Sequence, residues 1–134
     1  MREASKIDLL RQVPLFAKCT KRELEAIAAL ADEIDLPAGK TLTKQDDHGR
    51  EFFVLVEGAA EVRRGGRKVN ALSAGDFFGE ISLVTERKRT ATVTTTGPVR
   101  ALVVTKQGFT GLLHRSPEIQ LKVLEAVVER LPGD

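Results

Sequence analysis

Residues 33–106 consist of short apolar runs separated by turn residues, and this spacing restricts the possible fold more than any other feature of the sequence. Short strands at such regular intervals are typical of antiparallel barrels and sandwiches. The Gly65-Gly66 pair between two of the runs predicts a tight hairpin. The unbroken apolar run Phe52–Val56 predicts a strand that is buried on both faces. We therefore predict a mainly β protein built on an antiparallel β jelly roll, a double-stranded β-helix, over residues 33–106.

Helical patterns flank this β region. On the N-terminal side, Thr20–Glu23 has the form of a capping box, which predicts a helix running to about Ala31. On the C-terminal side, Ser116-Pro117 places a capping residue before a proline suited to the first helical turn. We predict N-terminal helices over residues 1–31, C-terminal helices over 107–131 and a single domain over 1–134, because a chain of this length can bury one core.

The last predicted helix is apolar over an unusually wide arc. Its apolar residues spread over roughly 200° of the circumference, about twice the ~100° stripe of a simple surface helix. They are Ile119, Leu121, Val123, Leu124, Val127, Val128 and Leu131. We expect such a helix to cover the barrel and also to contact either a second chain or a bound ligand.

The composition argues against a nucleic-acid or membrane partner. Lys and Arg total 21 against 19 for Asp and Glu, and the basic residues are scattered apart from Arg63-Arg64 and Arg87–Arg89. No run approaches the ~18 consecutive apolar residues of a membrane span. The only cysteine, Cys19, has no partner for an intrachain disulfide, and no targeting segment is visible. We therefore expect a cytoplasmic protein.

Metal and nucleophilic chemistry lack candidate residues. Some jelly rolls are enzymes that hold a metal inside the barrel, but His48 and His114 are the only histidines here and lie far apart in the sequence. Neither Ser82 nor Thr90 has a histidine placed to activate its hydroxyl group. We predict no metal site and no enzymatic activity.

The stretch Phe78–Thr95 combines residues suited to a small anion with a sugar attached. Gly79 has no Cβ, so a ligand can come within hydrogen-bonding distance of the backbone. If residues 80–83 form a helical turn, its unpaired N–H groups point at the anion. Arg89 can give two parallel hydrogen bonds to phosphate oxygens. A phosphate would repel the Glu80 carboxylate, whereas a ribose hydroxyl can donate a hydrogen bond to it.

The motif Gly79-Glu80-x-Ser82-Leu83, followed after five residues by Arg89-Thr90-Ala91-x-Val93, resembles the phosphate-binding cassette of the cyclic nucleotide-binding domains. Catabolite activator protein and the regulatory subunits of protein kinase A carry domains of this family. The resemblance covers nearly the whole chain through Leu36–Gly39, Phe53–Gly58 and Gly75–Phe78. Two positions depart from the family pattern, since Asp46 stands where glycine is usual and Lys88 where proline or a neutral residue is common.

The resemblance implies a nucleotide site in a cassette that spans residues 78–91. The family's glutamate takes the ribose 2′-OH and its arginine takes the cyclic phosphate, which assigns these roles to Glu80 and Arg89. The expected ligand is cyclic AMP, and cyclic GMP is the alternative because a hydroxyl at Thr90 can bond the guanine 2-amino group. The expected ligand-binding residues are Phe78, Gly79, Glu80, Ile81, Ser82, Arg89, Thr90 and Ala91.

In similar domains the last helix closes over the base, which here implies a lid. Its expected contact residues are Leu124, Val127, Val128 and Leu131. We predict a regulatory domain that senses cyclic nucleotide and transmits binding through this helix, which could contact a second copy of the chain or an effector protein. The alternative is a protein-interaction module that has the same fold but has lost nucleotide binding.

Overall fold

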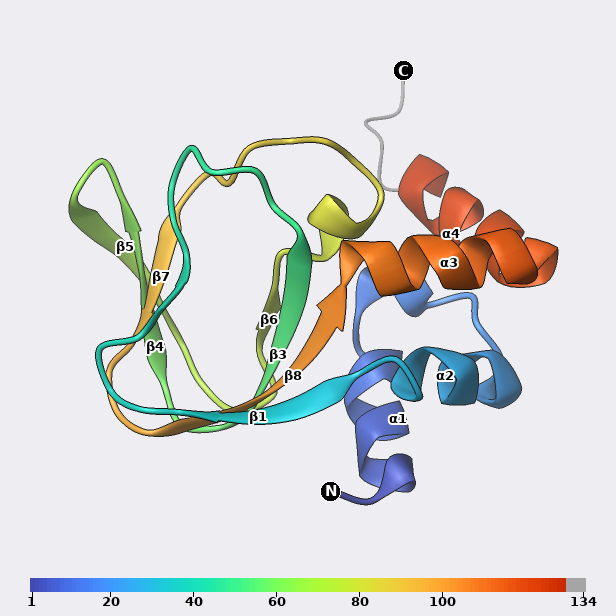
Figure 1. Cartoon of the computed structure of the whole chain (residues 1–134), viewed down its shortest axis with the longest axis horizontal. Coiled ribbons are helices and arrows are strands. Elements are labelled where there is room, and N and C mark those ends of the chain that lie inside the picture. Colours follow the sequence, from blue (N-terminus) through green and yellow to red (C-terminus); the bar gives the residue numbers. More distant parts are fainter. Residues whose placement is uncertain (130–134) are drawn as a thin grey trace.

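The computed structural model describes residues 1–129, in which two antiparallel four-stranded sheets form the predicted jelly roll. One sheet has the strand order β1-β8-β3-β6 and the other the order β2-β7-β4-β5 (Figure 1). The strands are β1 (Asp32–Leu36), β2 (Thr41–Thr43), β3 (Glu51–Glu57), β4 (Ala60–Arg64), β5 (Arg67–Leu72), β6 (Phe77–Phe78), β7 (Thr92–Thr95) and β8 (Val99–Thr105). The predicted fold is confirmed.

Two sequence patterns of the β region form as predicted. Gly65 and Gly66 join β4 to β5, and both have positive φ angles, 60° and 79°, as a two-residue hairpin turn requires. In β3, the residues Phe52–Leu55 of the predicted buried run Phe52–Val56 are buried, whereas Val56 is only half-buried. Phe52 and Val54 pack toward the helices, whereas Leu55 packs between the two sheets, so this strand serves two hydrophobic cores.

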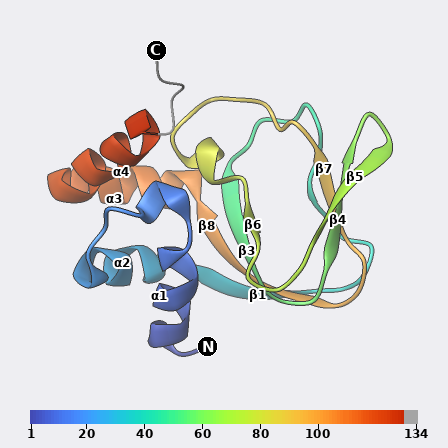
Figure 2. The ribbon, with the colours of Figure 1, turned by 180° about the vertical axis from the view of Figure 1, so that it is seen from behind.

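Helices gather at one end of the barrel, which Figure 2 shows from behind. They are α1 (Glu3–Arg11), η1 (Pro14–Phe16), α2 (Lys21–Ala28), α3 (Lys106–Arg115) and α4 (Pro117–Glu129). The capping box at the start of α2 is confirmed, with Glu23 N donating to Thr20 Oγ1 and Thr20 N donating to Glu23 Oε1. This helix ends at Ala28 rather than near Ala31 as predicted. After Ala29, the N–H groups of Leu30 and Ala31 bond carbonyls three residues back, so the chain tightens into a turn.

The helical core depends on aromatic contacts between η1, β3 and α3. The ring of Phe16 meets that of Phe52 edge-on, with 5.9 Å between centroids, and lies 5.7 Å from that of Phe109. All three side chains are fully buried. Helix α4 packs mainly on η1 and α3, which differs from our expectation that it covers the barrel. The N-terminal helices already occupy that end of the barrel, so α4 forms an outer layer.

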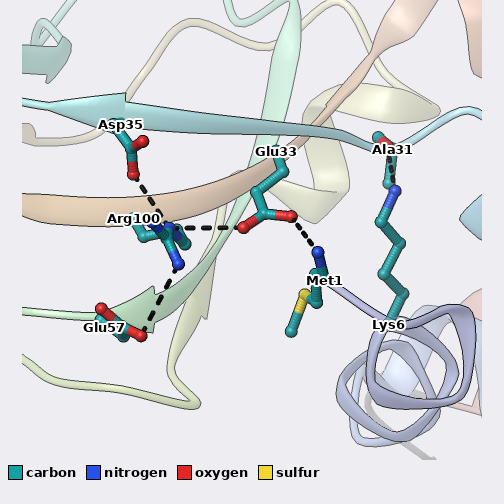
Figure 3. Close-up of polar contacts among 7 residues, drawn as sticks. All are labelled: Met1, Lys6, Ala31, Glu33, Asp35, Glu57 and Arg100. Carbon is teal, nitrogen blue, oxygen red and sulfur yellow. Dashed lines mark hydrogen bonds and ion pairs between the residues drawn. The ribbon is translucent and has the colours of Figure 1, made fainter.

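An ion network ties the N-terminal segment to the outside of the first sheet (Figure 3). The Met1 ammonium group lies 2.9 Å from Glu33, and Arg100 of β8 bonds Asp35 at 2.9 Å while also pairing with Glu33. Hydrogen bonding and the charge of Asp35, together with the other nearby carboxylates, raise the pKa of Arg100. Asp35 is exposed and Glu33 and Arg100 are only half-buried, so the network orients the segment more than it stabilises the fold.

Candidate functional site

The predicted cassette begins with a glycine that no other residue could replace without strain. Gly79 follows β6 and has a φ of 85°, in the left-handed region, and η2 (Glu80–Leu83) begins at the next residue. A Cβ at Gly79 would lie 2.4 Å from Arg89 Nη1 and 2.9 Å from the Glu51 carbonyl oxygen. Both the backbone conformation and the close approach of Arg89 therefore require glycine. The helical turn considered for residues 80–83 is present as a 3₁₀ turn.

Arg89 lies in the loop before β7, and its side chain packs against this turn. Its Nη1 donates to Ser82 Oγ at 2.9 Å and its Nη2 donates to the Glu51 carbonyl at 2.5 Å. Burial lowers the pKa of Arg89, while the Glu51 carboxylate acts in the opposite direction. An arginine titrates so far above neutrality that the guanidinium stays charged. The site thus holds a fixed, partly buried cation beside a glycine backbone.

A second loop, residues 46–49, supports Arg89 from the other side. The Arg89 N–H donates to the Asp47 carbonyl at 2.7 Å, and the Asp46 N–H donates to the Arg89 carbonyl at 2.9 Å. Asp46 has a φ of 74° and is the only described non-glycine residue with a positive φ angle. The family's usual glycine at this position is thus matched here by its conformation, and aspartate is one of the residues that tolerate it.

Gly49 of the same loop lies so close to the cassette that a side chain has no space there. A Cβ at this position would meet Ser82 Oγ at 2.1 Å and Arg89 Cζ at 3.1 Å. In the sequence, Gly49 ends a short stretch of turn residues, 46–49, and nothing nearby links it to the cassette. Its role beside the cassette depends on two segments about 40 residues apart in the sequence, which is why local patterns did not reveal it.

One cavity of about 430 Å³ contains all of the predicted ligand-binding residues, and its volume is within the usual range for small-molecule sites. Its lining includes Phe78, Gly79, Glu80, Ile81, Ser82, Arg89, Thr90 and Ala91. The sequence analysis missed the opposite wall, which β4 and β5 provide through Val62, Arg64, Asn70 and Leu72. These four residues alternate along their two strands, so the period of two, which places alternate residues on one face, could have identified them.

A larger cavity of about 690 Å³ is lined in part by Gly49 and Glu51, two residues that lie against Arg89 of the first cavity. Arg50, Glu86 and Lys106 are among its lining residues, and Lys106 Nζ pairs with Glu86 at 2.8 Å. None of the eight predicted ligand-binding residues lines it. The smaller cavity is therefore the candidate nucleotide site, because the arginine and the glycine backbone open onto that one.

The predicted lid residues do not reach this cavity in the structure. Leu124 and Val128 lie on the outer face of α4 with 56% and 55% of their surface exposed, and Val127 packs partly against the helical core. Leu131 lies outside the described residues. The inner face of α4 is attached to the N-terminal helices, and Lys122 Nζ bonds Glu23 Oε1 at 2.5 Å. Burial alone would raise the pKa of Glu23, but its bonds to Lys122 and Thr20 hold that pKa below the ordinary value.

Residues 1–129 contain no group of three or more His, Cys, Asp or Glu side chains that could hold a metal ion. Among the helices of the same residues, none combines the length and apolar character that a membrane span requires.

In this jelly roll a short helical turn precedes one strand, and an arginine from the following loop lies against that turn. This arrangement defines a class of small-ligand-binding barrels. Within this class the chain belongs to the cyclic nucleotide-binding domain family, whose sequence pattern matches residues 33–116. This assignment agrees with the resemblance seen in the cassette sequence.

Individual relatives agree with the family assignment. The chain is 37% identical over 130 residues to a cAMP-dependent protein kinase regulatory subunit of Blumeria graminis, covering 92% of this chain and 33% of the relative. It is 35% identical over 126 residues to a cyclic nucleotide-gated potassium channel of Rhizobium etli, covering 93% and 35% respectively. The chain thus spans only about a third of the length of these two relatives.

A solved structure supports the fold independently. The N-terminal domain of a transcriptional regulator from Streptomyces coelicolor A3(2) matches with a TM-score of 0.82 and 30% sequence identity. The match covers 92% of this chain and 91% of that one. The same barrel, with its flanking helices, therefore occurs in a protein that is similar over nearly its whole length.

Proposed function

We propose that this chain is a regulatory domain, without catalytic activity, that binds cyclic AMP in the 430 Å³ cavity. The position of Arg89 is the observation that carries this proposal. Its guanidinium is charged, partly buried and held by Ser82 and the Glu51 carbonyl next to the Gly79 backbone. A singly charged cyclic phosphate fits beside it, and the guanidinium fork can form two parallel bonds to phosphate oxygens.

The remaining cavity residues have roles consistent with the rest of the ligand. Glu80 opens the helical turn and lines the cavity, where its carboxylate can accept a hydrogen bond from the ribose 2′-OH. Val62 and Leu72 give the opposite wall an apolar surface for the base. We favour cyclic AMP over cyclic GMP because several similar relatives are named cAMP-dependent. Thr90 leaves cyclic GMP as the alternative.

We further propose that the domain acts in the cytoplasm and passes the binding event on through α4. Leu121, Leu124 and Val128 form an exposed apolar stripe along this helix, at intervals of three and four residues. An interval pattern of this kind is typical of a helix that packs against another helix. A second copy of the chain or an effector protein is the partner that such a stripe fits.

Calorimetric titration of cyclic AMP and cyclic GMP into the purified protein tests the proposal. Arg89→Ala leaves a partly buried phosphate charge unpaired, which typically costs ~2–5 kcal/mol, so affinity should fall roughly 30-fold or more. Arg87→Ala is the control, because Arg87 lines the same cavity but is exposed and should contribute only a small, salt-sensitive term. Binding of a folded Arg89→Ala protein at the parent's affinity would contradict the assignment.

The composition offers a direct check on the preparation. The chain has no Trp and no Tyr, so a denatured sample has almost no absorbance of its own near the purine maximum. Nucleotide that co-purifies with the protein should therefore stand out in the spectrum, and its base can then be identified.

A further inference from the structure

The hairpin formed by β4 and β5 projects from the barrel at the end opposite the helices (Figure 1). Four basic residues surround its glycine turn, namely Arg63, Arg64, Arg67 and Lys68, and all four are exposed. The two strands contain one acidic residue, Glu61, whose carboxylate pairs with Arg63 at 2.7 Å. The tip of the hairpin therefore carries a clear excess of positive charge, although the whole chain is close to neutral.

The register of the hairpin places these like charges directly opposite one another. Arg63 is the cross-strand partner of Lys68, and Arg64 is the partner of Arg67. Two adjacent like-charge pairs destabilise a hairpin, because opposed side chains approach closely. Natural sequences break such local rules mainly at functional sites. An anion bound along the hairpin would convert this repulsion into attraction.

Strand β5 also has a free edge. It is the last strand in the order β2-β7-β4-β5, so its outer side has no neighbouring strand within the described residues. Its first five residues, 67–71, are exposed, and Val69 is a large apolar side chain with 52% of its surface exposed. The Ala71 N–H already donates to Asn70 Oδ1, and the register with β4 shifts beside Val69. The remaining exposed edge offers backbone N–H and C=O groups to a further strand.

We propose that the outer edge of β5 binds an extended acidic peptide segment of a partner protein as an added strand. The segment's backbone would continue the sheet. Arg67 and Lys68 are consecutive and point to opposite faces of the strand, so the alternate carboxylates of the segment would pair with one of the two, while the other adds longer-range attraction. Alternate apolar residues of the segment would pack on Val69. The backbone ladder favours a peptide over a nucleic acid, and a narrow ribbon with one large exposed apolar side chain offers a membrane little to insert.

The proposal stands independently of nucleotide binding. Arg67, Lys68 and Val69 do not line the nucleotide cavity, whereas Arg64 and Asn70 do. The test therefore uses the nucleotide-free full chain and avoids substitutions in the cavity wall.

The probe is a fluorescein-labelled ten-residue peptide of alternating Glu and Val, with binding followed by fluorescence anisotropy. We expect saturable binding that weakens as salt rises. The double variant Arg67→Glu, Lys68→Glu should lose at least tenfold in affinity. The same variant should have a raised Tm, because its cross-strand pairs become opposite in charge. The control is Lys21→Glu, Arg22→Glu at the exposed start of α2, which changes the net charge equally at the other end of the molecule. It should bind like the parent.

A peptide methylated on alternate backbone nitrogens separates strand addition from charge attraction. It has the same charge but loses donors for the sheet ladder, so it should bind at least tenfold more weakly than the unmodified peptide. Equal binding of the two peptides, or an equal loss in the Lys21, Arg22 control, would overturn the proposal. Tighter binding to vesicles rich in phosphatidylserine, or to single-stranded DNA, would also overturn it, as would the absence of any peptide binding. A lowered Tm would refute the repulsion in the hairpin.

Discussion

Gly49→Ala is the sharpest test of the site geometry, because the substitution adds one methyl group at a position that contacts no ligand in our proposal. The new Cβ would lie 2.1 Å from Ser82 Oγ, whereas an ordinary contact needs about 3.4 Å. The hydroxyl must therefore move by about 1.3 Å, the difference between these distances. That movement breaks its 2.9 Å hydrogen bond from Arg89 Nη1.

The lost bond gives the expected magnitude. Hydrogen bonds to charged groups are worth ~1.5–3 kcal/mol. Without the bond to Ser82, the ligand itself must fix the position of the Arg89 side chain, so it should bind roughly 10- to 150-fold more weakly. Calorimetry measures the affinity, and thermal unfolding reports how much of the strain falls on the fold itself. Overpacking of this kind typically costs ~1–3 kcal/mol of stability.

Two further variants make the reasoning refutable. Gly97→Ala is the matched control, since a Cβ there meets nothing within 4 Å and the φ of Gly97 is not positive, so its affinity and Tm should stay unchanged. Ser82→Ala removes the same hydrogen bond directly, so the double variant with Gly49→Ala should lose less than the sum of the two single losses. Parental affinity and stability in Gly49→Ala would refute the close packing around Arg89.

Four other substitutions and one control address the remaining parts of the site. Glu80→Gln should weaken cyclic AMP binding by ~1.5–3 kcal/mol, because a charge-assisted hydrogen bond is lost. A much smaller loss with the 2′-deoxy analogue would identify the ribose contact, whereas equal losses with the two nucleotides would exclude it. Thr90→Ala should selectively reduce cyclic GMP affinity if the hydroxyl reads guanine, and a loss with both nucleotides would place it on the phosphate instead. Leu124→Ser and Val128→Ser should each reduce affinity roughly tenfold if these side chains cover the base. Leu121→Ser, equally exposed but outside the predicted lid, is their control.

The barrel and the cassette were predictable because their determinants are local. The Gly65-Gly66 turn, the capping box at Thr20 and the apolar run of β3 each depend on a few consecutive residues, and each formed as predicted. The cassette motif is similarly compact, and all eight of its predicted residues line one cavity.

The features that sequence analysis missed depend on contacts between distant segments. Gly49 meets Arg89 only because the loop at 46–49 pairs with residues 87–89. The ion pair of Lys122 with Glu23 joins residues 99 apart, and it helps to place α4 on the N-terminal helices rather than on the barrel. A helical pattern shows which residues are apolar but does not show which of several apolar surfaces they will cover.

The position of α4 limits how it could act as a lid. Burying Leu124 and Val128 against a nucleotide would gain ~1.5–3 kcal/mol each. If α4 left the helical core to do so, it would expose Ile119, Val123 and Ala126, which are buried there, and lose about as much. A ligand shifts an equilibrium only through its differential affinity for the two states, so such a movement would gain almost nothing.

We therefore expect α4 to move together with α3 and the N-terminal helices as one packed unit. Hydrogen exchange distinguishes the two movements. Addition of cyclic AMP should slow exchange in α4 while η1 and α2 keep their protection. Faster exchange in η1, whose residues Leu15 and Phe16 are buried under the other helices, would show that α4 leaves its site and would refute movement as a unit.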